Sequence, residues 1–568
     1  MIHRFTYCLL IGLTAFSLNG FSQTVSIVNK HFVVDGNSNT PIYFNGANTP
    51  WEAWNDFGGS FNQTKWLHDM QNLNASGINA ARIWFSCNGD GQPKVSATGI
   101  VSVPTQAFWD NCDLLFEYAR ENGIYIMATM MSFDHTKSVN NYSGNWQKMM
   151  NDTATIRTYL NNYLIPFVNR YKENPYLWSI DICNEIEWIA ENGSSIGNDK
   201  NWGCSYATLQ RFVAMCCVAM HSAGVERKDG SRVLVTLGSA ATKWNATMKR
   251  NKSFGTGWVT NSDGNKWNDA ALQSVYSNSK AYLDFYSPHF YGWINAWFYN
   301  PFEKSPADYG IDEKPCMIGE MPSKDPFPIP NSLLTSTNMS QSTAFANLKT
   351  LGWQGHMPWT ANLTSNLTSE VGTLADFGTA ALGFKNANAS LVYPSYIALQ
   401  TNALQIANAE NSSAELSVFS NIGWTVSSNE SWLSVNNTSG TGMSSLTFTA
   451  TANPGNSSRK AIVTFTGNGV NEVTLTVTQS DSVTASTIVT DAGIAVYPNP
   501  VTNKLYISAK KPFAKANVTI YKYDTIEVYK TDITANTNTI DLSLLPKGVY
   551  IVKIVSKDFG TFVTKIEK

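Results

Sequence analysis

The sequence predicts an α/β protein: a (β/α)8 TIM barrel first, then two small all-β sandwich domains. Two observations support this order. Short apolar strands alternate with amphipathic helices about eight times over roughly 380 residues, a length that such barrels reach. Beyond residue 405, Ser, Thr, Asn and Val dominate in a two-residue period, and only Trp424 and Trp432 of the 18 tryptophans lie there.

The barrel strands are expected in apolar runs that are bounded by turn residues. Helices are expected between them at residues 65–76, 109–122, 156–171 and 209–220, where apolar residues follow helical spacing, and Pro166 predicts a kink in the third. An open doubly wound sheet is the alternative. It would carry a glycine-rich loop after its first strand, and Asn-Gly-Ala-Asn-Thr-Pro-Trp at 45–51 is not one. The expected strands are residues 41–45, 78–85, 123–130, 177–185, 232–238, about 283–289, 315–319 and about 353–359.

The N-terminus has the features of a secretory signal. About 14 apolar residues follow Arg4, and the small residues Gly20 and Ser22 come next, so we expect a signal peptide over residues 1–22. A membrane anchor is the alternative, but this apolar run is too short to span a bilayer. The further expected parts are the barrel at 23–405, a β-sandwich at 413–480, a linker at 481–494 and a second β-module at 495–568.

Composition narrows the class of protein. A net charge of −2 with 14% charged residues argues against a nucleic-acid binder, which needs a basic face, and fits a secreted protein that handles neutral polymers. One of the eight cysteines lies in the signal, and the other seven form no CxxC pair, which disfavours zinc. A disulfide among Cys87, Cys112 and Cys204 stays open. We expect a monomer with no metal, no cofactor and no membrane span in the mature protein.

Two predicted strands end in carboxylates. The strand at 177–185 ends in Asn184 and Glu185, and the strand at 315–319 is followed by Glu320. Barrels place their chemistry at the carboxyl ends of such strands, and a pair of carboxylates in that position suggests glycoside hydrolysis. The alternative for Asn184 and Glu185 is the start of a solvated loop.

Other strand ends carry polar or aromatic residues, and together they resemble a known family. Arg82, His135 and Trp359 lie at strand ends, as do the motifs Asn184-Glu185, His289-Phe290-Tyr291 and Ile318-Gly319-Glu320. In this order they resemble the family 5, cellulase-like glycoside hydrolases of the (β/α)8 clan, over residues 24–400. In that family the acid/base follows the fourth strand and the nucleophile follows the seventh.

The resemblance implies roles for the charged residues. Glu185 would be the acid/base and needs a raised pKa, whereas Glu320 would be the nucleophile and must stay ionised. Arg82 would keep Glu320 ionised, its alternative role being a strand-end salt bridge. Asn184 would bond the 2-hydroxyl of the reacting sugar.

The resemblance also implies roles for the remaining strand-end residues. Tyr291 would orient Glu320, and His289 would line the sugar site, although a lone histidine is usually a core residue. Trp359 would be a stacking floor, with core packing as the alternative. His135 is a substrate-binding candidate that could equally be a satisfied loop histidine.

The two C-terminal regions resemble other modules. Residues 424–426, 431–435 and 477–479, with Asn453 and Arg459, resemble the BACON domain of Bacteroidetes glycan enzymes, which implies either carbohydrate binding or a spacer. Residues 496–500, 541–543 and 545–552 resemble the type A sorting domain of type IX secretion. That resemblance implies a partner in the secretion machinery, export through the periplasm, and a secreted or cell-surface location.

These features predict a secreted, retaining glycoside hydrolase. Its expected partner is a plant or algal polysaccharide, cleaved in endo fashion at β-1,4-mannan or β-1,4-glucan. Arg82-Ile-Trp84 resembles the mannan-cleaving members, and Phe133-Asp-His135 resembles the cellulose-cleaving ones. An exo-acting β-glycosidase and a non-catalytic glycan-binding surface protein are the alternatives.

Overall fold

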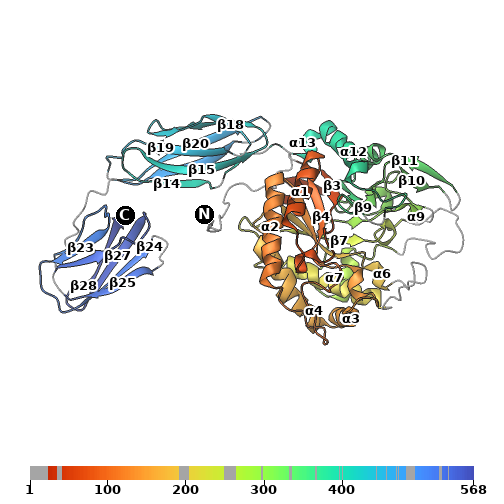
Figure 1. The fold of residues 1–568 in the computed structure, drawn as a ribbon, viewed down its shortest axis with the longest axis horizontal. Helices are drawn as coiled ribbons and strands as arrows, with labels where there is room; N and C mark the ends of the chain where they lie inside the picture. The colour runs from red at the N-terminus through yellow and green to blue at the C-terminus, as the bar shows by residue number, and fades with distance from the viewer. Residues whose placement is uncertain are drawn as a thin grey trace, which may run out of the picture.

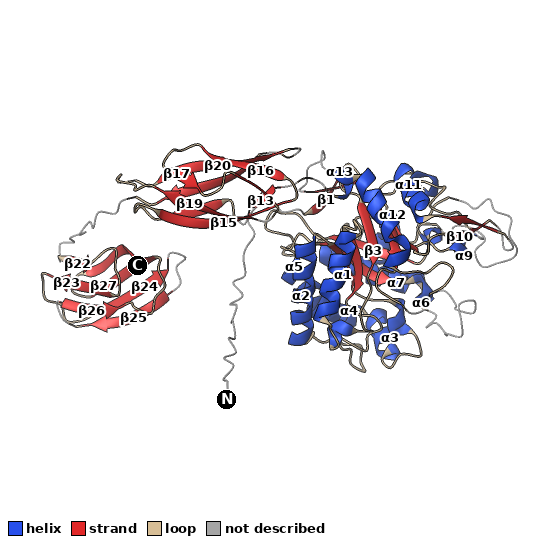
Figure 2. Ribbon diagram, turned by 45° about the horizontal axis from the view of Figure 1, so that its top comes forward, coloured by secondary structure: helices blue, strands red, loops and turns tan. Residues whose placement is uncertain are grey.

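A computed structural model gives the fold of the protein: an α/β body followed by two all-β bodies (Figures 1 and 2). The described residues are 24–34, 41–190, 204–248, 264–295, 298–331, 335–364, 367–393, 395, 397–399, 401–442, 444–455, 457–468, 470, 472–481, 493–522, 527–534 and 537–568. The predicted signal peptide and most of the predicted linker lie outside them.

The α/β body is a closed barrel of parallel strands. Its sheet runs in the order β8-β7-β6-β5-β4-β3-β12-β9, and bridges Tyr286 to Cys316 and His289 to Glu320 join β8 to β9. Parallel pairing puts all the carboxyl ends of the strands at one rim. The strands are β3 (Phe44–Asn48), β4 (Ala80–Trp84), β5 (Tyr125–Thr129), β6 (Leu177–Asn184), β7 (Leu234–Ser239), β8 (Ser287–Pro288), β9 (Ile318–Pro322) and β12 (Gly355–Trp359).

Helices cover the outside of this barrel (Figure 2). The long ones begin at capping side chains: the Thr105 hydroxyl accepts from the backbone N–H of Phe108, and α2 ends at Gly123 in the left-handed region at φ 67°. The helices are α1 (Gln63–Ala75), α2 (Gln106–Asn122), α3 (Ser143–Asn151), α4 (Thr153–Tyr159), α5 (Ile165–Tyr171), α6 (Glu187–Ala190), α7 (Tyr206–Met220), α8 (Asp269–Val275), α9 (Gly292–Asn295), α10 (Pro306–Tyr309), α11 (Gln341–Thr350), α12 (Leu374–Ala387) and α13 (Ala389–Val392).

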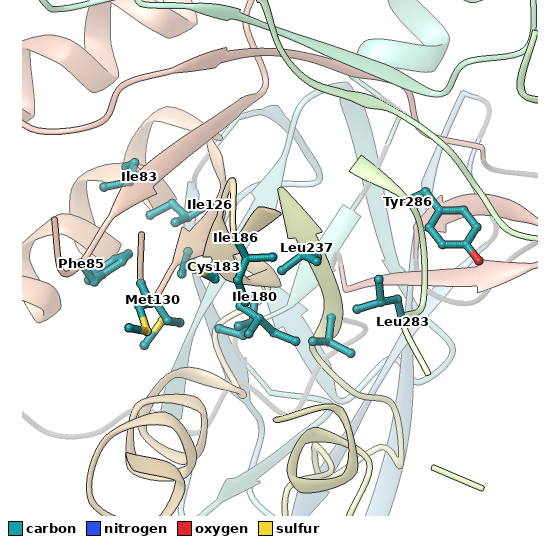
Figure 3. Packing of buried hydrophobic residues seen from close by; sticks show 14 of the residues in the cluster. Ile83, Phe85, Ile126, Met130, Ile180, Cys183, Ile186, Leu237, Leu283 and Tyr286 are labelled. Atoms are coloured by element: carbon teal, nitrogen blue, oxygen red, sulfur yellow. The ribbon is translucent and has the colours of Figure 1, made fainter. Parts of the chain in front are cut away.

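Successive side chains of a strand point to opposite faces of the barrel, so they form two cores, one outside the barrel under the helices and one inside it. Outward residues such as Ile83 of β4, Phe85 directly after β4, and Ile180 of β6 pack between barrel and helices, as Figure 3 shows. Inward residues fill the amino end of the barrel, where Trp178 stacks on Phe44 at 3.8 Å between ring centroids. The same alternation turns Arg82, two residues after the inward Ala80, into the barrel interior.

The predicted barrel is confirmed. Each expected strand overlaps a strand of the structure, and each of the four expected helices overlaps a helix. The expected helix is interrupted before Pro166 by a π-helical turn, η3 (Leu160–Leu164), between α4 and α5, and Pro166 is the second residue of α5. Two hairpins were not predicted: β1 (Val25–Val28) with β2 (His31–Val34), and β10 (Phe327–Pro330) with β11 (Ser336–Met339).

The second body is a β-sandwich that starts before the boundary predicted from sequence. Its sheets run β13-β15-β19-β17 and β14-β21-β20-β16-β18. The expected barrel end at 405 falls inside β14, because the short strands β13 and β14 precede the change in composition. The strands are β13 (Ile397–Leu399), β14 (Ala403–Ile406), β15 (Ser412–Ser420), β16 (Gly423–Ser428), β17 (Leu433–Val435), β18 (Ser439–Thr441), β19 (Ser444–Ala450), β20 (Arg459–Gly467) and β21 (Val473–Gln479).

The third body has two smaller sheets, β22-β23-β26 and β25-β24-β27-β28, with its own apolar cluster between them. Across the described residues, no helix has both the length and the apolarity that a membrane crossing needs. The strands are β22 (Ile494–Tyr497), β23 (Lys504–Ala509), β24 (Ala516–Lys522), β25 (Glu527–Ile533), β26 (Thr537–Asp541), β27 (Val549–Ser556) and β28 (Gly560–Glu567).

The seven cysteines outside the signal region are all free thiols. Six are buried, and Cys204 is half-buried. The possible disulfide among Cys87, Cys112 and Cys204 is therefore not formed. Burial raises the pKa of the Cys112 thiol well above its usual value, which keeps it protonated and unreactive.

Candidate active site

The carboxyl ends of β4, β6, β8 and β9 bring the predicted residues together. Arg82 lies in β4, Asn184 ends β6 with Glu185 directly after it, and Glu320 lies in β9. His289 follows β8 and pairs with Glu320 across the barrel closure. Residues that are far apart in the sequence thus share one rim because parallel strands end there.

The Arg82 guanidinium is the hub of this rim. It is fully buried, and its Nη1 donates to Glu320 Oε1 at 2.7 Å and to Asn48 Oδ1 at 3.1 Å. Its Nη2 donates to Asp181 Oδ2 at 2.6 Å and to Asn184 Oδ1 at 2.8 Å, and Nε adds a second bond to Asp181 at 3.0 Å. A planar cation with five donors fits this set of oxygens, which a lysine cannot match.

Glu320 is held by two donors. Besides Arg82, the Tyr291 hydroxyl donates to its Oε2 at 2.8 Å. Burial raises the pKa of Glu320, while the Arg82 charge and the Tyr291 hydrogen bond oppose that rise. Both bonds favour a charged acceptor, so they stabilise the ionised form that a nucleophile needs against the effect of burial.

Glu185 has a different environment. Its Oε2 accepts from the Trp188 indole N–H at 2.8 Å, and its Oε1 lies 2.9 Å from His289 Nδ1. Burial raises the pKa of Glu185 to about 7, against the opposing effects of the Trp188 bond and the Arg82 charge. A carboxyl that titrates near neutrality can both give and take a proton. Its backbone is in the left-handed region at φ 49°, which is uncommon for a residue other than glycine.

His289 lies between the two carboxyl groups. Its Nδ1 is 2.9 Å from Glu185 and 3.6 Å from Glu320 Oε2, and its ring is fully buried. Burial lowers the pKa of His289 to about 4, so the ring is neutral near pH 7. Among the described residues, nothing bonds its Nε2. A neutral imidazole in this place links the pair without adding charge.

Trp359, at the end of β12, belongs to an aromatic wall beside the pair. Its ring meets Trp84 at 5.1 Å and Trp51 at 5.9 Å between centroids, both edge to face. The strand register puts it next to Asn48 of β3 and Pro322 of β9, two residues from Glu320. It is half-buried, so one part of the indole stays open for a ligand.

His135 lies apart from these residues. Its Nε2 is 2.9 Å from Ser86 Oγ, its Nδ1 is 3.0 Å from the Ser132 carbonyl, and its ring packs on Trp146. The side chain is 1% exposed, and burial lowers its pKa to about 3. With both nitrogens bonded inside the protein, it matches the alternative of a satisfied loop histidine.

Two residues of this site, Asp181 and Asn48, were not predicted from sequence. Asp181, fully buried in β6, takes two bonds from Arg82 and one each from Thr129 and from the backbone N–H of Gly238. Asn48 accepts from Arg82 Nη1. Asp181 interrupts an apolar strand, and that was the available signal: a charge placed there requires a buried partner.

The three central side chains also have a spacing that a cation could bridge. One ligand atom each of Glu185, His289 and Glu320 lies within 4.8 Å of the others. The Arg82 guanidinium already supplies positive charge to Glu320 at 2.7 Å, and a second cation would be repelled there. The donor set therefore fits an acid pair better than a metal ligand set.

Comparison with known families identifies both C-terminal bodies. Residues 423–480 match the BACON model, described as "Putative binding domain, N-terminal". Residues 495–567 match the "Secretion system C-terminal sorting domain". Both resemblances inferred from the sequence are confirmed, and a protein with this sorting domain is secreted or displayed at the cell surface.

Comparison with known proteins covers the barrel. The chain is 24% identical over 382 residues to a mannan endo-1,4-beta-mannosidase of Cryptopygus antarcticus, spanning 64% of this chain and 90% of the relative. It is 24% identical over 363 residues to one of Mytilus edulis, spanning 61% and 89%. An endo-1,4-beta-mannanase structure from Eisenia fetida shares the fold with a TM-score of 0.51 at 21% identity, over 64% and 95%.

Barrel, paired carboxylates and relatives together define the class: this protein is a glycosidase. The barrel is joined to a BACON domain and to a C-terminal sorting domain of type IX secretion.

Proposed function

We propose that the protein is a retaining, endo-acting hydrolase of β-1,4-mannan, with Glu185 as acid/base and Glu320 as nucleophile. The observation that carries the proposal is the spacing of this pair: an oxygen of each carboxyl lies within 4.8 Å of the other. Retaining glycosidases hold their carboxyl groups roughly 5–5.5 Å apart, whereas inverting ones need about 6.5–9.5 Å for a water.

The environments of the two residues support a division of roles. Protonated Glu185 gives its proton to the departing glycosidic oxygen while ionised Glu320 attacks the anomeric carbon, which forms a glycosyl-enzyme. Glu185 then takes a proton from water, and that water releases the sugar from Glu320. Arg82 and Tyr291 favour the ionised form of Glu320 before its attack and again after the sugar is released.

Binding residues of the proposed site face the same rim. The Asn184 amide oxygen is occupied by Arg82, so its amide nitrogen can bond the sugar 2-hydroxyl. Trp359 offers an indole face on which sugar C–H groups can pack. The choice of mannan rests on the two relatives, both of which are mannan endo-1,4-beta-mannosidases.

Product analysis tests this proposal. The full chain is incubated with β-1,4-mannan, β-1,4-glucan and xylan, beside Glu185→Gln and Glu320→Gln. Mixed oligosaccharides from mannan alone, with both variants inactive, would support it. Only monomer or dimer would mean an exo-acting enzyme. Glycan binding without cleavage by the wild type would mean a non-catalytic protein.

A further inference from the structure

A third carboxylate near the pair takes no part in the chemistry proposed above. Glu187 follows Glu185 by two residues, begins α6 and is fully buried. Its Oε1 accepts from the Ser239 hydroxyl at 2.5 Å and from the Trp267 indole N–H at 2.6 Å, and its Oε2 accepts from the Ala240 backbone N–H at 3.0 Å. Two of these donors attach α6 to the end of β7, and the third ties it to Trp267, which lies just before α8.

The end of β7 also anchors His289. The Ser239 carbonyl, on the residue whose hydroxyl bonds Glu187, accepts from the backbone N–H of His289 at 2.8 Å. One residue earlier, the Gly238 carbonyl accepts from the backbone N–H of Glu185 at 2.7 Å. Backbone bonds from this short corner, residues 238–240, therefore reach both Glu185 and the histidine beside it.

Trp188 links Glu187 to the acid/base from the other side. It is the next residue along α6, and its indole N–H is the donor on Glu185 Oε2. The indole meets Trp244 edge to face at 5.2 Å and lies 6.0 Å from Trp293. When α6 is fixed by Glu187, the position of the Trp188 donor is fixed with it.

We propose that Glu187 is a positioning residue for the acid/base. It clamps α6 to residues 238–240, and this corner sets both contacts of the Glu185 carboxyl: Trp188 on Oε2 and His289 on Oε1. The inference rests on the proposed role of Glu185. Misplacement of a catalytic group by about 1 Å can cost on the order of 100-fold in rate, so a clamp outside the substrate site affects catalysis.

The clamp also tunes the proton affinity of Glu185. The Trp188 bond favours ionised Glu185, so loosening it raises the pKa of Glu185. Other charges reach Glu185 from the neighbouring elements, and no test variant replaces them: Arg82 on β4, Asp134 and Lys137 on the 3-10 turn η2 (Phe133–Thr136), and Glu320 on β9.

Three variants of the full chain test the clamp through the pH profile of kcat/KM on mannan. Trp267→Phe removes one donor from Glu187 and leaves every charge in place. Glu187→Gln replaces the carboxyl group, whose pKa burial raises to about 7, with an amide. Trp188→Phe removes the indole donor on Glu185 while keeping an aromatic ring. We expect kcat to fall about 10- to 100-fold for Glu187→Gln with KM little changed.

The basic limb of the pH profile reports the pKa of the general acid, Glu185, and it distinguishes the possible roles of Glu187. A clamp predicts an upward shift in all three variants, smallest in Trp267→Phe. If Glu187 acts only through its charge, the limb should shift downward in Glu187→Gln alone, because a negative charge is lost. If its role is only structural, the melting temperature should fall while the limb stays in place. Either result overturns the proposal. Glu185→Gln run in parallel separates the failures, since an active Glu185→Gln would instead refute the proposed function.

Discussion

Arg82→Lys is the substitution that tests the buried network most severely. Arg82 makes five N–H···O contacts with Asp181, Glu320, Asn48 and Asn184, from three nitrogens spread over a plane. A lysine ammonium keeps the charge but radiates three donors from one atom, so at least two contacts are lost. Removing one partner of a buried ion pair costs about 3–5 kcal/mol; because lysine keeps the charge, we expect the free energy of unfolding to fall by about 3 kcal/mol, the lower end of that range.

The variant should also move the acid limb of kcat/KM to higher pH. Glu320 has to be ionised to attack, and the Arg82 charge lowers its pKa. Weakening that contact raises the pKa of Glu320, so a higher pH is needed to ionise it. Urea unfolding followed by tryptophan fluorescence, together with the pH profile, measures both effects.

Arg170→Lys is the matched control. Arg170 also donates to an aspartate, Asp113, through Nε and Nη2, but this pair is exposed, with side chains 40% and 42% accessible. Exposed pairs contribute roughly 0–1 kcal/mol, so this change should be nearly neutral. The reasoning about the buried network is wrong if the free energy of unfolding of Arg82→Lys lies within about 1 kcal/mol of that of Arg170→Lys and the acid limb of its pH profile does not move.

Three further predictions follow from single contacts. Tyr291→Phe removes a donor from Glu320, so kcat/KM should fall by about 10-fold with its acid limb moved to higher pH; an unchanged profile would contradict this. Burial and the nearby Glu52 raise the pKa of Asp69 to about 8. The stability that comes from its protonated form is therefore lost as the pH rises from about 4 toward 8, and thermal melts of Asp69→Asn should not show that loss. Dithiothreitol should leave the melting temperature unchanged because the cysteines are free, whereas a drop of several degrees would reveal a disulfide.

Much of the barrel could be predicted because its strands are buried on both faces and appear in the sequence as apolar runs. The strand-end positions of Glu185 and Glu320 followed from those runs alone. Strands β13 and β14 could not be placed in this way. They are three and four residues long, and their partners in the sandwich lie more than ten residues further along the chain.

The side-chain network was predictable only in part. Arg82 was placed beside Glu320, and its bond to Glu320 is present, but Asp181 and Asn48 were missed because their role depends on which way each strand faces at the rim. His135 was predicted to belong to the site because it follows a strand. Only its contacts with Ser86 and Ser132 show where its nitrogens point. Pairing across the barrel, not local pattern, decides such cases.

The most direct measurement is the anomeric configuration of the first product. Proton NMR of a β-linked manno-oligosaccharide during early hydrolysis distinguishes the two stereochemical outcomes before mutarotation. With Glu185 and Glu320 acting as a close pair, the β-anomer should appear first. If the α-anomer appears first, the enzyme inverts, and Glu320 is not the nucleophile.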